Sequence, residues 1–96
     1  NKTMKNKVAL VVGAGDNLGS AICKCFSNDG FIVVAARRNG DKLANLQKEI
    51  ETTGGVFHGY SLDARKENDV IEFIKNIEKN IGPIDAAIYN IGGNIK

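Results

Sequence analysis

Apolar and polar positions along the chain follow two alternating patterns. Four short segments are continuously apolar or alternate every second residue, which is typical of strands. Between them, apolar residues recur every three or four positions, which is the spacing of the buried face of a helix. The order is therefore β-α-β-α-β-α-β, and strands that alternate with helices favour an α/β fold with a parallel sheet.

The expected strands differ in their apolar character. They span residues 8–12, 31–36, 56–62 and 84–89. The first two are continuously apolar, as in strands that are covered on both faces. The third alternates and places His58 and Tyr60 on one face of the sheet.

The three expected helices are each defined by an apolar stripe. The stripe of the first is Leu18, Ala21, Ile22, Cys25 and Phe26, and that of the third is Val70, Phe73, Ile74, Ile77 and Ile81. Asn28-Asp29-Gly30 ends the first helix. The second is expected to be capped by Asp41 and to continue to about Thr53, with Leu43, Leu46 and Ile50 on its inner face.

Right-handed crossovers restrict how four parallel strands are arranged. The expected order is 3-2-1-4 in a three-layer, Rossmann-like fold. The direction in which successive strands are added to the sheet then reverses between strands 1 and 4, and ligands bind at the carboxyl ends of the strands at such a switch point. The glycine-rich turn after strand 1 lies at this point.

Composition limits the function classes. The chain has 96 residues, 43% of them hydrophobic and 25% charged, which is typical of one small globular domain. Its 13 basic and 11 acidic residues are mixed, and a net charge of +2 does not favour nucleic-acid binding. No apolar run approaches the roughly 18 residues of a membrane span.

Cysteine, histidine and the N-terminal segment indicate the compartment. Cys23 and Cys25 are two residues apart and would point to different faces of a helix, so we expect two reduced thiols and a cytoplasmic protein. His58 has no acidic cluster beside it, so no metal site is expected. Residues 1–6 lack the apolar core of a signal peptide and are interpreted as a tail, with Met4 as a candidate native start. Residues 7–96 form the expected domain.

The turn after strand 1 reads Gly13-Ala14-Gly15-Asp16-Asn17-Leu18-Gly19. Free N–H groups at the start of a helix attract anions, and small residues allow a pyrophosphate to approach closely. Gly19 lies one turn into the helix, where the missing side chain permits tight packing on the strand. Ordinary turn glycines are the alternative interpretation.

This segment resembles the cofactor turn of the short-chain dehydrogenase/reductase family, whose pattern is Thr-Gly-x-x-x-Gly-[Ile/Leu]-Gly. Gly13, Leu18 and Gly19 match the pattern. Val12 replaces the threonine and Asn17 replaces the middle glycine; asparagine tolerates left-handed backbone better than other non-glycine residues. The resemblance extends from about Lys7 to Asn94 and implies a dinucleotide-binding domain.

Arg37 and Arg38 follow strand 2, where many dinucleotide sites carry an acidic residue for the adenosine ribose. A guanidinium there suits a phosphate through paired hydrogen bonds, so the implied cofactor is NADP(H) rather than NAD(H). A solvated charge pair on a loop is the alternative.

Two further segments match the family in order. Asp63, followed by Ala64, matches the aspartate beside the adenine, and capping of the next loop or helix is its alternative role. Asn90 and Gly92 in Tyr-Asn-Ile-Gly-Gly resemble the family's Asn-Asn-Ala-Gly, which lines the adenosine pocket.

The family's catalytic Tyr-x-x-x-Lys is not found. Four residues after Tyr60 is Ala64, and four after Tyr89 is Gly93. We therefore expect a truncated unit: the cofactor-binding part of an oxidoreductase that interconverts small carbonyl and alcohol substrates by hydride transfer. A non-catalytic dinucleotide-binding or sensing module, a methyltransferase-like fold and a purely structural role are the alternatives, and Arg37-Arg38 disfavours the methyltransferase.

The expected sheet has an incompletely covered side. Strand 4 would be an apolar edge, and one helix would cover only part of the second face. We therefore expect exposed apolar surface near strands 1 and 4, and self-association through this edge or face.

Overall fold

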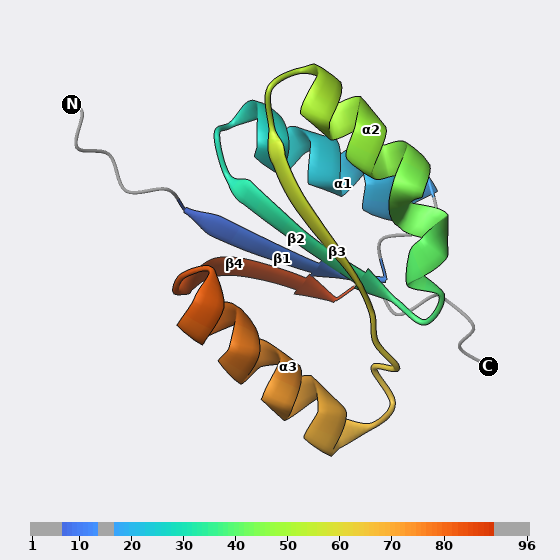
Figure 1. Cartoon of the computed structure of the whole chain (residues 1–96), viewed down its shortest axis with the longest axis vertical. Coiled ribbons are helices and arrows are strands. Elements are labelled where there is room, and N and C mark those ends of the chain that lie inside the picture. Colours follow the sequence, from blue (N-terminus) through green and yellow to red (C-terminus); the bar gives the residue numbers. More distant parts are fainter. Residues whose placement is uncertain (1–6, 14–16, 90–96) are drawn as a thin grey trace.

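The computed structural model describes residues 7–13 and 17–89. In chain order the elements are β1 (Val8–Val12), α1 (Asn17–Asn28), β2 (Ile32–Arg37), the 3₁₀ turn η1 (Gly40–Leu43), α2 (Ala44–Thr52), β3 (Val56–Ser61), α3 (Glu67–Asn80) and β4 (Ile84–Tyr89). Figure 1 labels the α-helices and strands and colours the chain from blue at the N-terminus to red at the C-terminus. The predicted alternation of strands and helices is confirmed.

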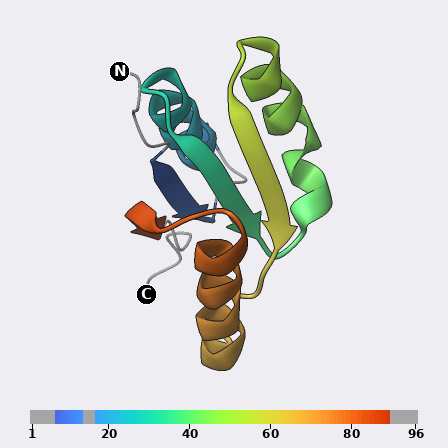
Figure 2. The same ribbon diagram turned by 60° about the vertical axis from the view of Figure 1, so that its left-hand side comes forward.

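The four strands form one parallel sheet in the order β3-β2-β1-β4. Helices α1 and α2 pack on one face and α3 on the other, which gives three layers (Figures 1 and 2). Both the predicted fold class and the predicted strand order are confirmed. The direction of winding reverses between β1 and β4, so the carboxyl ends of these strands form the expected switch point.

β1 is the most enclosed strand. Each of its five residues exposes at most 2% of its surface. Val11 joins the core under α1 and α2, whereas Val8, Leu10 and Val12 join the core under α3. The expectation of exposed apolar surface near strand 1 was therefore wrong, because α3 alone covers the second face of β1.

β4 is only half covered and pairs with β1 on one side. Its residues alternate between half-buried and exposed, and Tyr89 is 45% exposed. The register shifts by one residue where Val8 pairs with Ile84 and Ala9 with Ala86. Asp85 is the additional residue, and its Oδ2 accepts a hydrogen bond from the Val8 N–H at 2.9 Å.

The buried face of α1 is rotated from the predicted stripe. Gly19 and Cys23 are buried, and Ile22 and Phe26 pack against the core. Leu18 is 60% exposed, and Ala21 and Cys25 are exposed as well. The small residues Gly19 and Cys23 face the sheet, and their size lets the helix lie close to it. The rotation of α1 about its axis is therefore explained by side-chain size rather than by hydrophobicity.

The start of the second helical segment also differs from expectation. Asn39, not Asp41, provides the cap: its Oδ1 accepts the Asp41 N–H at 3.2 Å, and the 3₁₀ turn η1 precedes α2. The predicted inner face is confirmed, since Leu43, Leu46 and Ile50 are all buried.

The stripe of α3 lies as predicted. Ile77 is buried, and the remaining members are half-buried. Tyr60 of β3 contacts this helix through an edge-on ring contact with Phe73, with centroids 5.3 Å apart. No helix in the described part of the chain has the length and apolar character needed to cross a membrane.

Candidate functional site

Gly13 directly follows β1 at the switch point. Its φ of +87° is a left-handed conformation that favours glycine, and its N–H donates to the Ala36 carbonyl at 2.7 Å. This bond continues the β1–β2 pairing to the end of the strands. Predicted site residue Gly15 lies outside the described residues.

The first turn of α1 points toward the same edge of the sheet. Asn17 begins the helix and is exposed, and Leu18 projects into solvent. Gly19 is buried, so the helix lies close to the sheet, which agrees with the packing role expected from the sequence. Three of the predicted turn residues are thus at the amino end of a 12-residue helix, whose dipole favours an anion.

Arg37 and Arg38 leave the sheet at the carboxyl end of β2. Arg37 is half-buried as the last residue of the strand, and its carbonyl accepts the Leu62 N–H at 2.8 Å. Arg38 is exposed. Within residues 7–13 and 17–89, neither guanidinium forms an ion pair or hydrogen bond, so both retain their donors for an anion.

A close contact joins the loop after β2 to the end of β3. The Gly40 N–H donates to Ser61 Oγ at 2.9 Å. A Cβ at Gly40 would lie 2.7 Å from that oxygen and 2.9 Å from backbone atoms of Ser61 and Tyr60, so only glycine fits. This contact was not predicted from the sequence. The only sign of it in the sequence is the glycine two residues after Arg38, since glycine allows two backbone segments to approach closely.

Asp63 follows β3 and forms a compact turn with Arg65. Its Oδ1 accepts hydrogen bonds from the backbone N–H and the Nε of Arg65, and its Oδ2 accepts one from Nη2, each at 3.0 Å. The side-chain hydrogen bond with Arg65 is the largest cause that holds the pKa of the Asp63 carboxyl well below its usual range; Arg38 also lowers it electrostatically. The loop-capping role weighed for Asp63 is thus observed, and Arg65 is a residue that the sequence interpretation did not single out.

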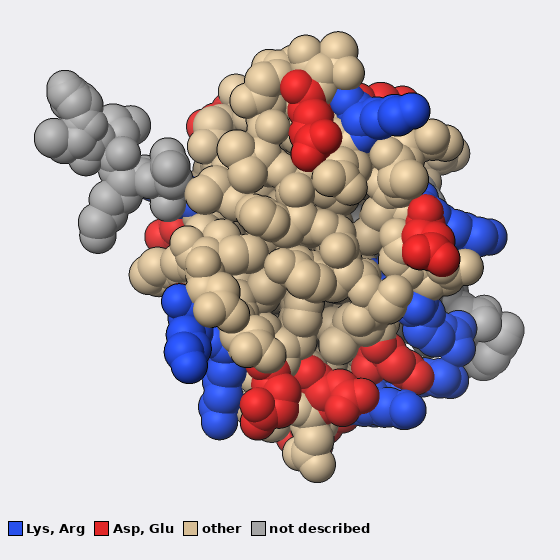
Figure 3. All heavy atoms as spheres, in the orientation of Figure 1, with Lys and Arg blue, Asp and Glu red and all other residues tan. Residues whose placement is uncertain are grey.

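Arg38 and Asp63 line the same open cavity of about 430 Å³ at this edge. The other lining residues are Ser61, Leu62, Asp69, Glu72, Phe73 and Asn76. Ala64 instead packs against the core under α3. Figure 3 shows acidic side chains gathered where α3 begins. On the face of the molecule seen in Figure 3, the charged groups lie mostly around the rim. Predicted site residues Asn90 and Gly92 lie outside the described residues.

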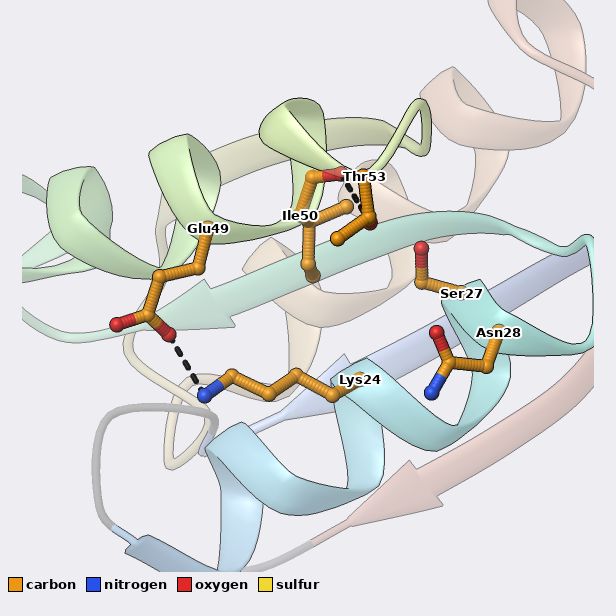
Figure 4. A pocket seen from close by; sticks show the side chains of 6 residues that line it. All are labelled: Lys24, Ser27, Asn28, Glu49, Ile50 and Thr53. Atoms are coloured by element: carbon orange, nitrogen blue, oxygen red, sulfur yellow. Dashed lines mark hydrogen bonds and ion pairs between the residues drawn. The ribbon is translucent and has the colours of Figure 1, made fainter.

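A separate cavity of about 260 Å³ lies between α1 and α2 (Figure 4). Lys24 and Glu49 form an ion pair of 2.7 Å across it, and Ser27, Asn28 and Thr53 line its far end. These last residues are at the ends of helices that precede β2 and β3. The cavity is therefore toward the amino ends of the strands, away from the switch point.

Comparison with known proteins assigns the whole described fold to one group. A sequence profile of the short chain dehydrogenase family matches residues 7–96. Sorbitol-6-phosphate 2-dehydrogenase of Escherichia coli (strain K12) is 30% identical over 89 residues, which cover 91% of this chain and 34% of that enzyme. The chain thus spans about a third of the length of this curated relative.

Solved structures agree in fold. A short-chain dehydrogenase from Rhodopseudomonas palustris superposes with a TM-score of 0.88 at 43% identity, covering 96% of this chain and 43% of the other. A metagenomic short-chain oxidoreductase in complex with NADP superposes with a TM-score of 0.83 at 26% identity, covering 90% of this chain and 39% of the other. Both superpositions cover at least 90% of this chain, so the described fold is shared with these structures.

Proposed function

The chain belongs to the short chain dehydrogenase family, and on this premise we propose that it binds NADP(H), in preference to NAD(H), at the carboxyl edge of the sheet. One observation carries the preference: Arg38 stands exposed after β2, where a ribose-binding carboxylate would otherwise be expected, and it has no ion-pair partner among the described residues. The complex of a structural relative with NADP supports this choice.

The described residues fit such a cofactor. Gly13 has the left-handed backbone of a tight turn, and the buried Gly19 brings α1 close to the sheet. The helix start then offers backbone N–H groups to the pyrophosphate. Arg37 and Arg38 would bind the phosphate on the ribose through their guanidinium groups, and Asp63 would accept a hydrogen bond from the adenine amine.

The proposed reaction class is interconversion of a small carbonyl and its alcohol. The nicotinamide ring supplies the hydride chemistry when bound, and the residues described here bind and orient the dinucleotide. Neither Tyr60 nor Tyr89 is followed four residues later by lysine. The second candidate function is a module that binds the dinucleotide without catalysis, and turnover of NADPH by the protein would exclude it.

The test of the proposal is a fluorescence titration with NADPH and NADH. We expect tighter binding of NADPH, and loss of that preference in Arg38→Ala and in Arg37→Asp, because each removes a donor to the phosphate. Lys48→Ala is the matched control, since Lys48 is an exposed cation on α2. A folded chain that binds both cofactors equally, or neither, would contradict the proposal.

We further propose that β4 mediates contact with a second copy of the chain, and that the protein is cytoplasmic. Tyr89 and Ala87 are exposed on β4, which pairs with no second strand among the described residues. Cys23 and Cys25 are both free thiols, which suits a reducing compartment. Sedimentation equilibrium checks the first point: a monomer at all concentrations would contradict association.

A further inference from the structure

The loop after β3 contains an ion pair that folding stability does not explain. Arg65 gives the Asp63 carboxylate three hydrogen bonds, two of them from a guanidinium in fork-like geometry. The Arg65 side chain is 71% exposed, however, and that of Asp63 is 20% exposed. Ion pairs so close to solvent contribute little to the free energy of unfolding, so we looked for a role of this pair in ligand binding.

The pair affects the electrostatic surroundings of Arg38, because the Asp63 carboxylate lies beside it. Asp63 is near enough to Arg38 for the two charges to interact, and both residues line one cavity. Arg38 nevertheless forms no ion pair with Asp63, whose two oxygens are directed to Arg65. The carboxylate is thus compensated within its own loop, and the guanidinium of the neighbouring loop stays available.

We propose that Arg65 is a specificity-determining positioning residue, which neutralises Asp63 and thereby leaves Arg38 free to bind the ribose phosphate of NADP(H). This inference rests on the proposed function. Without Arg65, the Asp63 carboxylate would attract the Arg38 guanidinium and repel an incoming phosphate dianion. NAD(H) lacks that phosphate, so its binding would be affected much less.

The experiment compares dissociation constants of NADPH and NADH for the wild-type protein, Arg65→Gln and the double variant Asp63→Asn/Arg65→Gln. We expect Arg65→Gln to weaken NADPH binding on the order of tenfold and NADH binding less than about threefold. The double variant removes the uncompensated carboxylate and is expected to recover most of the NADPH affinity. Asparagine at position 63 keeps an acceptor oxygen for the turn and for the adenine amine.

Two controls separate charge compensation from other roles. Lys66→Gln removes the adjacent positive charge of the same loop, and we expect a smaller loss of NADPH affinity than in Arg65→Gln. Arg65→Lys keeps the charge without the fork and should retain an intermediate NADPH preference. Circular dichroism confirms that each variant is folded.

The outcomes distinguish this inference from the function on which it depends. Equal weakening of both cofactors in Arg65→Gln would overturn the inference. Failure of the double variant to recover NADPH affinity would do so too, because Arg65 would then contact the phosphate itself. A folded wild-type protein without NADPH preference would instead overturn the proposed function.

Discussion

β1 and β4 are neighbours in one sheet, but they occupy very different environments. Leu10 of β1 is fully buried, whereas Ala87, its partner in the β4 register, is exposed. Helices cover both faces of β1, while α3 leaves the adjoining part of β4 open. β1 is central and β4 lies at the edge, so the comparison shows that burial of an apolar strand depends on its position in the sheet and on which faces the crossover helices cover.

The largest expected effect follows from emptying the core beside β1. Leu10→Ala should lower the free energy of unfolding by about 2–5 kcal/mol, because it removes apolar contacts and leaves a cavity under α3. Leu18→Ala makes the same chemical change at a side chain that is 60% exposed and should cost less than about 1 kcal/mol. Urea unfolding of both variants measures the difference, and equal losses would contradict the assignment of Leu10 to the core.

The pH dependence of the free energy of unfolding tests whether the Cys23 thiol of α1 is buried. Burial raises the pKa of the Cys23 thiol from 9.0 to about 12. The unfolded thiol ionises first, so stability is complete below pH 9 and falls as the pH rises toward 12. At pH 10 we expect a loss of about 1.4 kcal/mol relative to pH 8 in urea unfolding. Cys23→Ala should lack this component; an unchanged slope in that variant would contradict the burial of the thiol.

A smaller effect is expected where the two strands begin. Asp85→Ala removes the acceptor of the Val8 N–H and should lower stability by about 1 kcal/mol. Hydrogen exchange at the Val8 amide should accelerate at the same time. Asp85→Asn keeps an acceptor oxygen and serves as the control, and equal exchange in all three proteins would show that the bond is not formed.

The smallest effect is expected on the open part of β4. Ala87→Ser adds one hydroxyl at an exposed position and should change the free energy of unfolding by less than about 0.5 kcal/mol. Thermal unfolding is sufficient to measure it. The measurement is made at a protein concentration where the chain is monomeric, and a loss above about 1 kcal/mol there would mean that Ala87 is covered within the monomer. A loss that grows with protein concentration is the result that self-association through β4 predicts.

The fold could be predicted from the sequence because its main signals are local. The apolar runs that became β1 and β2, and the helical stripe that includes Phe73 and Ile77, specify strand or helix without reference to the rest of the chain. The rotation of α1 could not be predicted in this way. It depends on how closely Gly19 lets the helix approach the sheet, which is a tertiary property.

The candidate site was predictable only in part. Gly13, Arg38 and Asp63 lie at the carboxyl edge because strand ends and topology place them there. The pairing of Asp63 with Arg65 depends on the backbone of a short loop, and residues two apart in sequence carry no general pairing signal. For the same reason the Asn39 cap was missed in favour of Asp41.

The contact of Gly40 with Ser61 has a consequence for redesign of cofactor choice. This bond holds the loop after β2 against the end of β3. The distance between the charge of Arg38 on one loop and that of Asp63 on the other is therefore fixed by the contact. An engineer who replaces Arg38 with aspartate to favour NAD(H) would place two carboxylates near a single compensating Arg65. A successful exchange would therefore alter residues 38 and 63 together and leave Gly40 unchanged, because its contact with Ser61 holds the two loops together.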